Sequence, residues 1–214
     1  MAKEITIVRQ ASNNAEIAVN SMSISASRNV SSRRVMRNAI EADELEREGY
    51  KVERNKHPNG AYFAVYGKHP GHELEVGRIF AENGISLTLD REGMTAKING
   101  KTYILPSPDG HLGGVPKKGL THEIYKLGGK PDARTVAEAI KHTYKPFRPD
   151  PSKSVRSEVA ITISPIGSQY RKENIADGVA EYKRQVSAGE TTATPRLYLH
   201  VDESRRKIYK WDIK

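Results

Sequence analysis

Three carboxylates and one lysine occur in an order that could serve phosphodiester chemistry. Glu73 lies in "GHELEVGRIFAENG", Asp109 in "PSPDG", and both Glu123 and Lys126 in "LTHEIYKL". Carboxylate oxygens are hard ligands of the kind that Mg²⁺ and Mn²⁺ prefer, and a lysine can stabilise the negative charge that develops on an attacked phosphate. The three carboxylates are therefore the predicted metal ligands and Lys126 the predicted cation, provided that folding gathers them.

The elements that must position these side chains can be predicted from the spacing of apolar residues. Residues 71–84 have apolar positions at helical spacing and a terminal glycine, so they predict a helix with Glu73 near the edge of the face that points toward a sheet, and Glu75 as the reserve choice. "LTHEIYKL" predicts a strand. "PSPDG" places Asp109 at the end of a strand, although Pro-Asp-Gly is also a common turn sequence.

From residue 72 onward the pattern predicts helix, strand, strand, strand, helix, strand, helix, strand and strand. This order favours an α/β fold in which helices flank a mixed central sheet. We expect three parts: a flexible or partner-dependent arm over residues 1–31, a helix and β-hairpin module over 32–69, and the α/β domain over 70–214. The hairpin of the module is indicated by a Pro-Asn-Gly turn between two β-rich runs.

Composition narrows the classes of function. Thirty-five Lys and Arg residues against 26 Asp and Glu give the 214-residue chain a formal net charge of +9, which favours polyanionic partners such as nucleic acid. The absence of cysteine excludes disulfides, thiolate zinc sites and a cysteine nucleophile. No apolar run is long enough for a membrane span or a secretory signal, so we expect no membrane partner and a cytoplasmic protein, or one that another machine delivers into a target cell.

The order of elements, together with "HELEVGRIFAENG" followed by "PSPDG" and "HEIYK", resembles the PD-(D/E)xK nuclease superfamily. Within it, residues 70–214 look most similar to the C-terminal toxin domains of contact-dependent inhibition proteins, many of which cleave tRNA. The resemblance implies a restriction-endonuclease-like fold and a metal-dependent endonuclease that uses Mg²⁺ or Mn²⁺. It favours RNA, tRNA in particular, over DNA, and a toxin of this kind implies an immunity protein with an acidic surface.

The resemblance maps the helical Glu of the family onto Glu73, its aspartate onto Asp109, and its acid and lysine onto Glu123 and Lys126. One departure concerns the last pair. The family places these two residues two apart, whereas here they are three apart and should point to opposite faces of a regular strand. Either a β-bulge brings Lys126 back, or another lysine supplies the cation, the candidates being Lys117, Lys118 and Lys141.

Two further groups of basic residues are candidates for substrate binding. Lys117 and Lys118 lie in "GGVPKKGL", a predicted flexible loop that could follow a nucleic-acid backbone and that lacks the ending of a Walker loop. Arg33 and Arg34 lie at the start of a helix predicted from Ser32, where they could contact phosphates. The alternative for these arginines is an ordinary solvated helix face.

Two other functions are compatible with the same sequence. A non-enzymatic, basic nucleic-acid-binding or assembly protein of a phage or mobile element would use the α/β domain as a scaffold. A metal-independent RNase would use histidine as general acid and base. The histidines of the predicted α/β domain include His72, His111, His122 and His142. Their spacing does not predict a zinc site.

Overall fold

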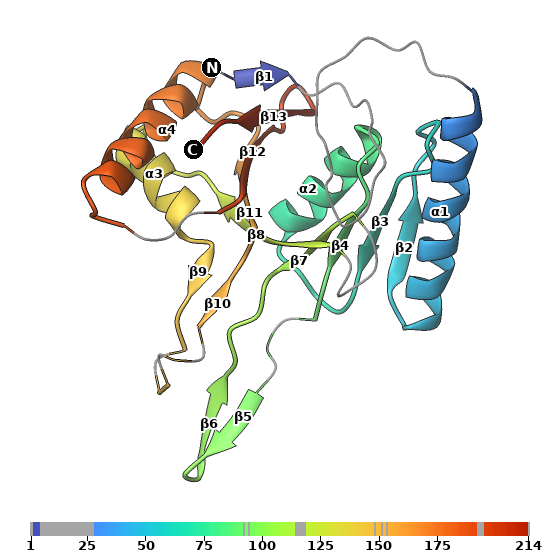
Figure 1. The fold of residues 1–214 in the computed structure, drawn as a ribbon, viewed down its shortest axis with the longest axis horizontal. Coiled ribbons are helices and arrows are strands. Elements are labelled where there is room, and N and C mark those ends of the chain that lie inside the picture. The colour runs from blue at the N-terminus through green and yellow to red at the C-terminus, as the bar shows by residue number, and fades with distance from the viewer. Residues whose placement is uncertain are drawn as a thin grey trace.

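The computed structural model describes residues 2–4, 28–91, 93, 95–113, 119–147, 149–150, 152, 154–191 and 195–213. Within these ranges the protein is an α/β fold in which helices cover both faces of one mixed sheet (Figure 1), as the sequence predicts. Because apolar residues alternate along the central strands, each face of the sheet carries its own hydrophobic core.

Nine strands of the described chain form the sheet, in the spatial order β1-β13-β12-β11-β8-β7-β4-β3-β2. In chain order they are β1 (Ala2–Glu4), β2 (Lys51–Arg54), β3 (Tyr62–Val65), β4 (Leu87–Leu89), β7 (Gly110–Leu112), β8 (Leu120–Lys126), β11 (Val159–Ser164), β12 (Leu197–Asp202) and β13 (Lys207–Trp211). At the centre, β7 pairs antiparallel with both β4 and β8, and β8 pairs parallel with β11. Residues just before β7 and within β8 are therefore neighbours.

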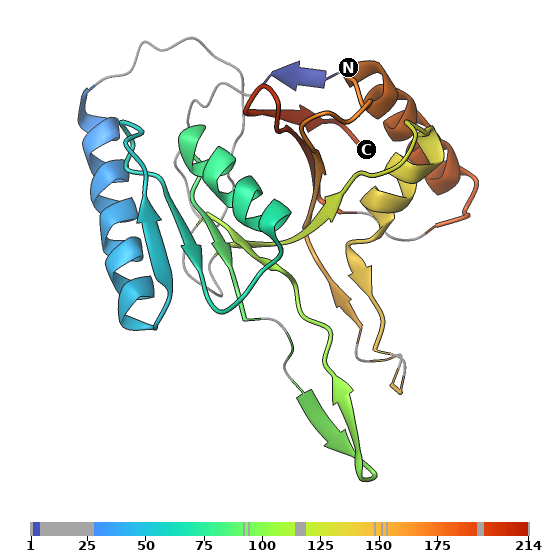
Figure 2. The same ribbon diagram turned by 180° about the vertical axis from the view of Figure 1, so that it is seen from behind.

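The helices are α1 (Arg28–Arg47), α2 (Gly71–Glu82), α3 (Ala133–Lys141) and α4 (Lys172–Ser187). Helix α2 packs on one face, over a core that includes Phe63, Leu89 and Ile124. The opposite face is covered at one end by α1, which packs on Tyr62, and at the other by α3 and α4 (Figures 1 and 2). Between α1 and α3 the same face of the central strands carries polar side chains, and these include Thr88, His111, Thr121 and Glu123.

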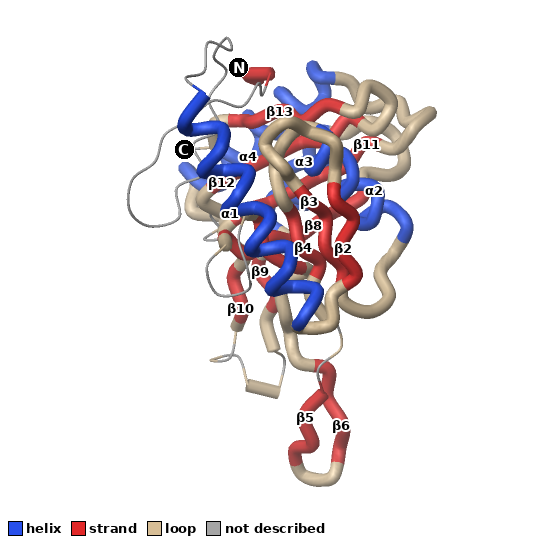
Figure 3. The backbone as a smooth tube through the Cα atoms, turned by 90° about the vertical axis from the view of Figure 1, so that its right-hand side faces the viewer, coloured by secondary structure: helices blue, strands red, loops and turns tan. Residues whose placement is uncertain are grey.

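Two small hairpins project from the same end of the sheet (Figure 3). The first joins β5 (Thr95–Ile98) to β6 (Lys101–Ile104) through Asn99-Gly100, whose φ values of 50° and 77° are those of a tight hairpin turn. The second joins β9 (Tyr144–Lys145) to β10 (Val155–Arg156), in a segment whose prolines predict only a loop. Strand β7 begins at the glycine of the Pro-Asp-Gly sequence and ends before the loop predicted from "GGVPKKGL".

The predicted N-terminal module is continuous with the central sheet. Helix α1 begins at Arg28, four residues before the predicted start at Ser32, and the hairpin β2–β3 forms as expected. Strand β3 pairs in parallel with β4, so the hairpin extends the sheet at one edge. The boundary near residue 70 stays a prediction. In the predicted arm, Ala2–Glu4 pairs with β13, and residues 5–27 lie outside the described ranges.

The contact between α3 and α4 depends on a glycine. Glycine lowers helix propensity, but a Cβ atom at Gly178 in α4 would lie 2.2 Å from Cβ of Val136 on α3. We expect Gly178→Ala to destabilise the protein by about 1–3 kcal/mol, because the two helices must separate. Thermal unfolding followed by circular dichroism should show a melting temperature lowered by roughly 2–10 °C. Ser187→Ala, at the exposed end of α4, is the matched control, and an unchanged or raised melting temperature for Gly178→Ala would contradict the close packing.

Candidate active site

Asp109 and Glu123 are buried carboxylates held next to each other by strand pairing. Asp109 directly precedes β7 and is 3% exposed, while Glu123 lies in β8 and is 4% exposed. The amide of Asp109 donates to the carbonyl of His122 at 3.0 Å, and the amide of Ile124 donates to Oδ2 of Asp109 at 2.7 Å. The backbone of the residues on either side of Glu123 thus fixes the position of Asp109. The two predicted acids therefore lie next to each other, as the sequence predicts.

Lys145 lies between the two carboxylates. Its Nζ is 3.2 Å from Oδ1 of Asp109 and 2.6 Å from Oε2 of Glu123, and its side chain is 31% exposed. The hydroxyl of Ser157 donates to Oε1 of Glu123 at 3.4 Å. Lys145 belongs to β9, so the hairpin that follows α3 brings the cation to Asp109, which directly precedes β7, and to Glu123 in β8.

Burial and repulsion determine the protonation of this cluster. Burial raises the pKa of Glu123 to about 8, with the negative charge of Asp109 as the second cause, and these two effects outweigh the attraction of Lys145. For Lys145, burial alone would lower the pKa, but the two carboxylates raise it overall. Below about pH 8 the cluster therefore holds a proton on Glu123 and a positive charge on Lys145.

The raised pKa of Glu123 predicts a pH-dependent stability. Between its ordinary value of 4.5 and about 8, the unfolded chain loses the Glu123 proton while the folded protein keeps it. The stability from this proton is complete below pH 4.5 and is lost as the pH rises toward 8. Glu123→Gln removes this titration, so the melting temperature of the variant relative to wild type should rise by roughly 5 °C from pH 5 to pH 8.5. A difference that stays constant over this range would show that Glu123 titrates normally.

His142 lies beside the cluster, at the end of α3. Its pKa is lowered by burial first and by the charge of Lys145 second, while Asp109 acts in the opposite direction. Its ring packs against Tyr125, two residues after Glu123 on β8, with 5.3 Å between the ring centroids. The environment of His142, beside Lys145 and Asp109, therefore favours its neutral form.

A second polar group adjoins the first across the paired strands. The amide of Asp90 donates to the carbonyl of Asp109 at 2.8 Å. The Asp90 carboxylate accepts from the Tyr50 hydroxyl at 2.8 Å and lies 2.5 Å from Nδ1 of His111. Burial alone would raise the pKa of Asp90, but these contacts, led by His111, lower it. His122 points to the other face, where it is fully buried and its pKa is lowered to about 4 by burial.

The structure does not bring Glu73 to the other two predicted ligands. Glu73 lies in the first turn of α2 and is 6% exposed, and its Oε2 is 2.9 Å from Nδ1 of His69, in the segment just before the helix. In the part of the chain that the structure describes, no three side chains of His, Asp or Glu are grouped so that they could hold a metal ion. The predicted set of three ligands is thus divided into a pair, Asp109 and Glu123, and a separate Glu73–His69 contact.

Lys126 is placed on the side of β8 away from Glu123. Pairing with β11 continues residue by residue from His122 to Lys126 without a bulge, and Lys126 is exposed. The ammonium group next to Asp109 and Glu123, predicted to be that of Lys126, is that of Lys145 instead, a residue that the sequence analysis does not identify. Among the alternative cations, Lys141 pairs with Glu138 at 2.5 Å, and Lys117 and Lys118 lie outside the described residues.

The two candidate arginines lie on α1, beyond β2 and β3 at one edge of the sheet. Arg34 donates from Nη2 to the carbonyl of Gly84 at 3.2 Å, so it joins α1 to the segment after α2. Arg33 is exposed and remains a predicted phosphate contact. Arg34 has a structural partner that explains its position.

In comparisons with known proteins, no family model, no curated protein and no solved structure matches this chain. A search of the described residues for helices that could span a membrane gives none with the required length and apolarity.

Proposed function

We propose that this protein is a metal-dependent nuclease whose catalytic residues are Asp109, Glu123 and Lys145. The observation that carries the proposal is the convergence of two buried carboxylates, from adjacent strands, on one partly exposed ammonium group. Buried carboxylate pairs are costly to maintain, and strongly perturbed pKa values occur preferentially at functional sites.

The order of elements around the site supports the same proposal. Helix α2 is followed by β4, β7 and β8, then by α3 and β11, with Asp109 before the second of these sheet strands and Glu123 in the third. The resemblance to PD-(D/E)xK nucleases rests on an order of this kind, but it counts the hairpin of residues 95–104 among the strands, whereas in the structure this hairpin lies outside the central sheet and β7 occupies the middle position. The lysine is the point of difference, because it comes from β9 instead of β8.

The donor set fits a hard divalent cation. Mg²⁺ is commonly held by one or two carboxylates and completes its shell with water and substrate phosphate, so Asp109 and Glu123 suffice as its protein ligands. When bound at such a site, the ion lowers the pKa of an attacking water and neutralises charge on the phosphate. Glu73 is not required for this arrangement.

The residues of the chain supply the remaining functions. Glu123 must lose its proton before its oxygens can bind a cation, so activity should rise with pH toward about 8. Lys145 keeps a positive charge beside both carboxylates and can donate to a phosphoryl oxygen, which stabilises the negative charge of the pentacovalent phosphate. Asp109 is held by the amide of Ile124, which fixes its orientation.

We propose nucleic acid as the substrate because the chain carries a net charge of +9. RNA, and tRNA in particular, is favoured over DNA by the resemblance to toxin nucleases. If the protein acts as a toxin, the partner that blocks it should present an acidic surface to the basic chain.

The proposal is tested by incubating the protein with total tRNA, ribosomal RNA and plasmid DNA at pH 8, with Mg²⁺ or with EDTA. We expect cleavage with Mg²⁺ and none with EDTA, and the RNA substrates should be cut before the plasmid. Salt-dependent binding of all three substrates without cleavage would contradict the enzyme and support the basic binding or assembly protein.

A metal-independent RNase remains the second candidate because of one specific observation. Nδ1 of His111 lies 2.5 Å from the Asp90 carboxylate, and an imidazole beside a carboxylate is a candidate for general acid–base catalysis. Cleavage of RNA that persists in EDTA and is lost in His111→Asn would favour this mechanism over the metal-dependent one.

A further inference from the structure

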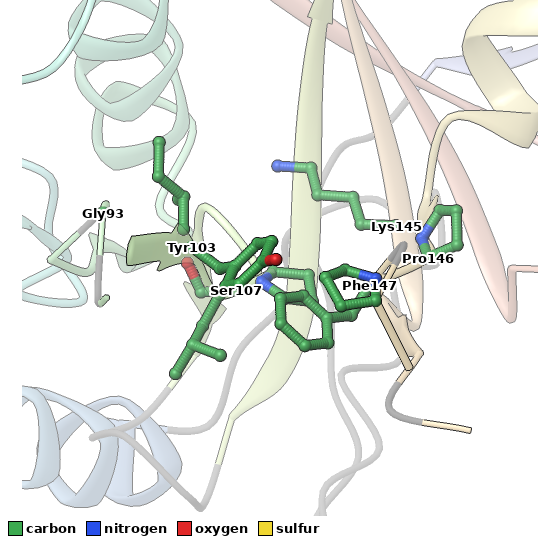
Figure 4. Close-up of a pocket in the computed structure, with 10 residues that line it drawn as sticks. Gly93, Tyr103, Ser107, Lys145, Pro146 and Phe147 are labelled. Carbon is green, nitrogen blue, oxygen red and sulfur yellow. The ribbon is translucent and has the colours of Figure 1, made fainter. Parts of the chain in front are cut away.

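A cavity opens beside the candidate active site. Its volume is about 630 Å³, within the size range of pockets that bind small organic groups. One wall is formed by the end of β6 and the segment that follows it. The other wall is formed by the end of β9 and the segment that follows that strand. The described residues that line it include Tyr103, Pro106, Lys145, Pro146 and Phe147 (Figure 4).

The walls of this cavity are suited to a flat aromatic group. Tyr103 is partly exposed and offers its ring to the cavity, while Phe147 is 3% exposed and supports that ring from behind, with the two rings edge to face and their centroids 6.0 Å apart. Proline rings and the side chains of Ile104 and Leu105 add further apolar surface. Aromatic side chains provide stacking surfaces for nucleobases of any sequence.

Lys145 connects the cavity to the acid pair. It is the charged residue among the described lining residues, and its Nζ contacts both Asp109 and Glu123. Figure 4 shows its side chain extending along the cavity beside the two rings. A base in the cavity would therefore be next to the place where a phosphate would meet Lys145.

Basic side chains lie on the two hairpins that border the cavity. Lys97 and Lys101 are exposed on β5 and β6, and Arg156 on β10 lies over the ring of Tyr144 at 5.2 Å. These cations can contact the phosphates on either side of a bound nucleotide. The surroundings of the cavity thus fit a nucleic-acid strand better than an uncharged ligand.

We propose that this cavity binds one unpaired nucleobase of the substrate strand. Because a base within a continuous duplex is stacked between its neighbours and cannot enter a side pocket, the site selects single-stranded or looped nucleic acid. This inference rests on the proposed nuclease function, and it specifies the substrate of that same site.

The test measures binding without cleavage, in EDTA, with the full-length Asp109→Asn protein. An oligonucleotide that carries one 2-aminopurine is titrated as a single strand and as a duplex, and 2-aminopurine riboside monophosphate is titrated in parallel. We expect the single strand to bind with a change in 2-aminopurine fluorescence, and the duplex to bind at least 10-fold more weakly, on the order of the loss of one stacked base.

Variants of Tyr103 show whether this cavity is responsible. Tyr103→Leu, made in the Asp109→Asn protein, should weaken single-strand binding by about 10-fold, whereas Tyr103→Phe should retain it. Ile166→Ala is the matched control, because Ile166 is 71% exposed and lies away from the site. It follows the C-terminal end of β11, whereas Ser157, which contacts Glu123, precedes the N-terminal end of that strand. Melting temperatures of the variants verify that each is folded.

Equal affinity for duplex and single strand, or unchanged binding by Tyr103→Leu, would overturn the inference. Binding of the monophosphate as tight as that of the oligonucleotide would also overturn it, since the ligand would then be a free nucleotide. The two proposals can fail separately. Tyr103-dependent binding without any cleavage by wild type contradicts only the nuclease, and cleavage that Tyr103→Leu leaves unchanged contradicts only the cavity.

Discussion

Replacing Asp109 by Asn should lower the rate of Mg²⁺-dependent cleavage at least about 100-fold, since losing a direct metal ligand costs more than the 10- to 100-fold typical of its hydrogen-bonding partners. Asn retains an oxygen that can accept from the amide of Ile124, so the fold should persist. The rate is measured with labelled tRNA at pH 8, and the melting temperature is measured on the same preparation.

Two matched controls accompany this variant. Glu73→Gln changes a buried carboxylate that contacts His69 outside the pair, and Lys126→Met changes an exposed residue on the same strand as Glu123. Both should cleave tRNA within a few-fold of the wild-type rate. A loss in Glu73→Gln as large as that in Asp109→Asn, with both proteins folded, would restore Glu73 to the site and contradict the two-carboxylate arrangement.

Lys145→Met should both abolish cleavage and destabilise the protein. At pH 8, where Glu123 is about half ionised, removing the ammonium leaves the Asp109 carboxylate and part of the Glu123 charge without their cation, and breaking a fully buried ion pair costs about 3–5 kcal/mol. Because Lys145 is 31% exposed, we expect a smaller loss, about 2 kcal/mol at pH 8, or a melting temperature lower by roughly 4–8 °C. The loss should diminish at pH 5, where Glu123 is protonated.

A double-mutant cycle identifies the cause. In a Glu123→Gln background, Lys145→Met should cost much less, because only one carboxylate then remains without a partner. Lys126→Met again serves as the control for the loss of a lysine. If Lys145→Met were equally destabilising in both backgrounds and at both pH values, its contribution would come from packing and not from the ion pairs.

Much of the scaffold can be predicted because its signals are local. Asp132 caps α3 by accepting from the amide of Arg134, and Asn99-Gly100 adopts the positive φ values of a tight hairpin. The acid pair can also be predicted, since Asp109 and Glu123 belong to segments near in sequence that pair as neighbours in the sheet. Short-range chemistry and a short connection determine these features.

The cation could not be predicted in the same way. Lys145 reaches the pair because a two-residue strand forms within a proline-rich segment and turns back beside β8, and this depends on tertiary packing that no local pattern records. For Lys126, by contrast, the spacing of three residues from Glu123 already indicated the opposite face of the strand. The position of Glu73 follows from which face of the sheet α2 covers, and residue spacing does not specify that face.

The most direct measurement is the binding of Mn²⁺, followed by the electron paramagnetic resonance signal of the free ion, in wild type, Asp109→Asn and Glu73→Gln. We predict one site in wild type that strengthens as the pH rises toward 8, its loss in Asp109→Asn, and its retention in Glu73→Gln. Binding that is unaffected by Asp109→Asn, or no binding by wild type at pH 8, would contradict a metal site at Asp109 and Glu123.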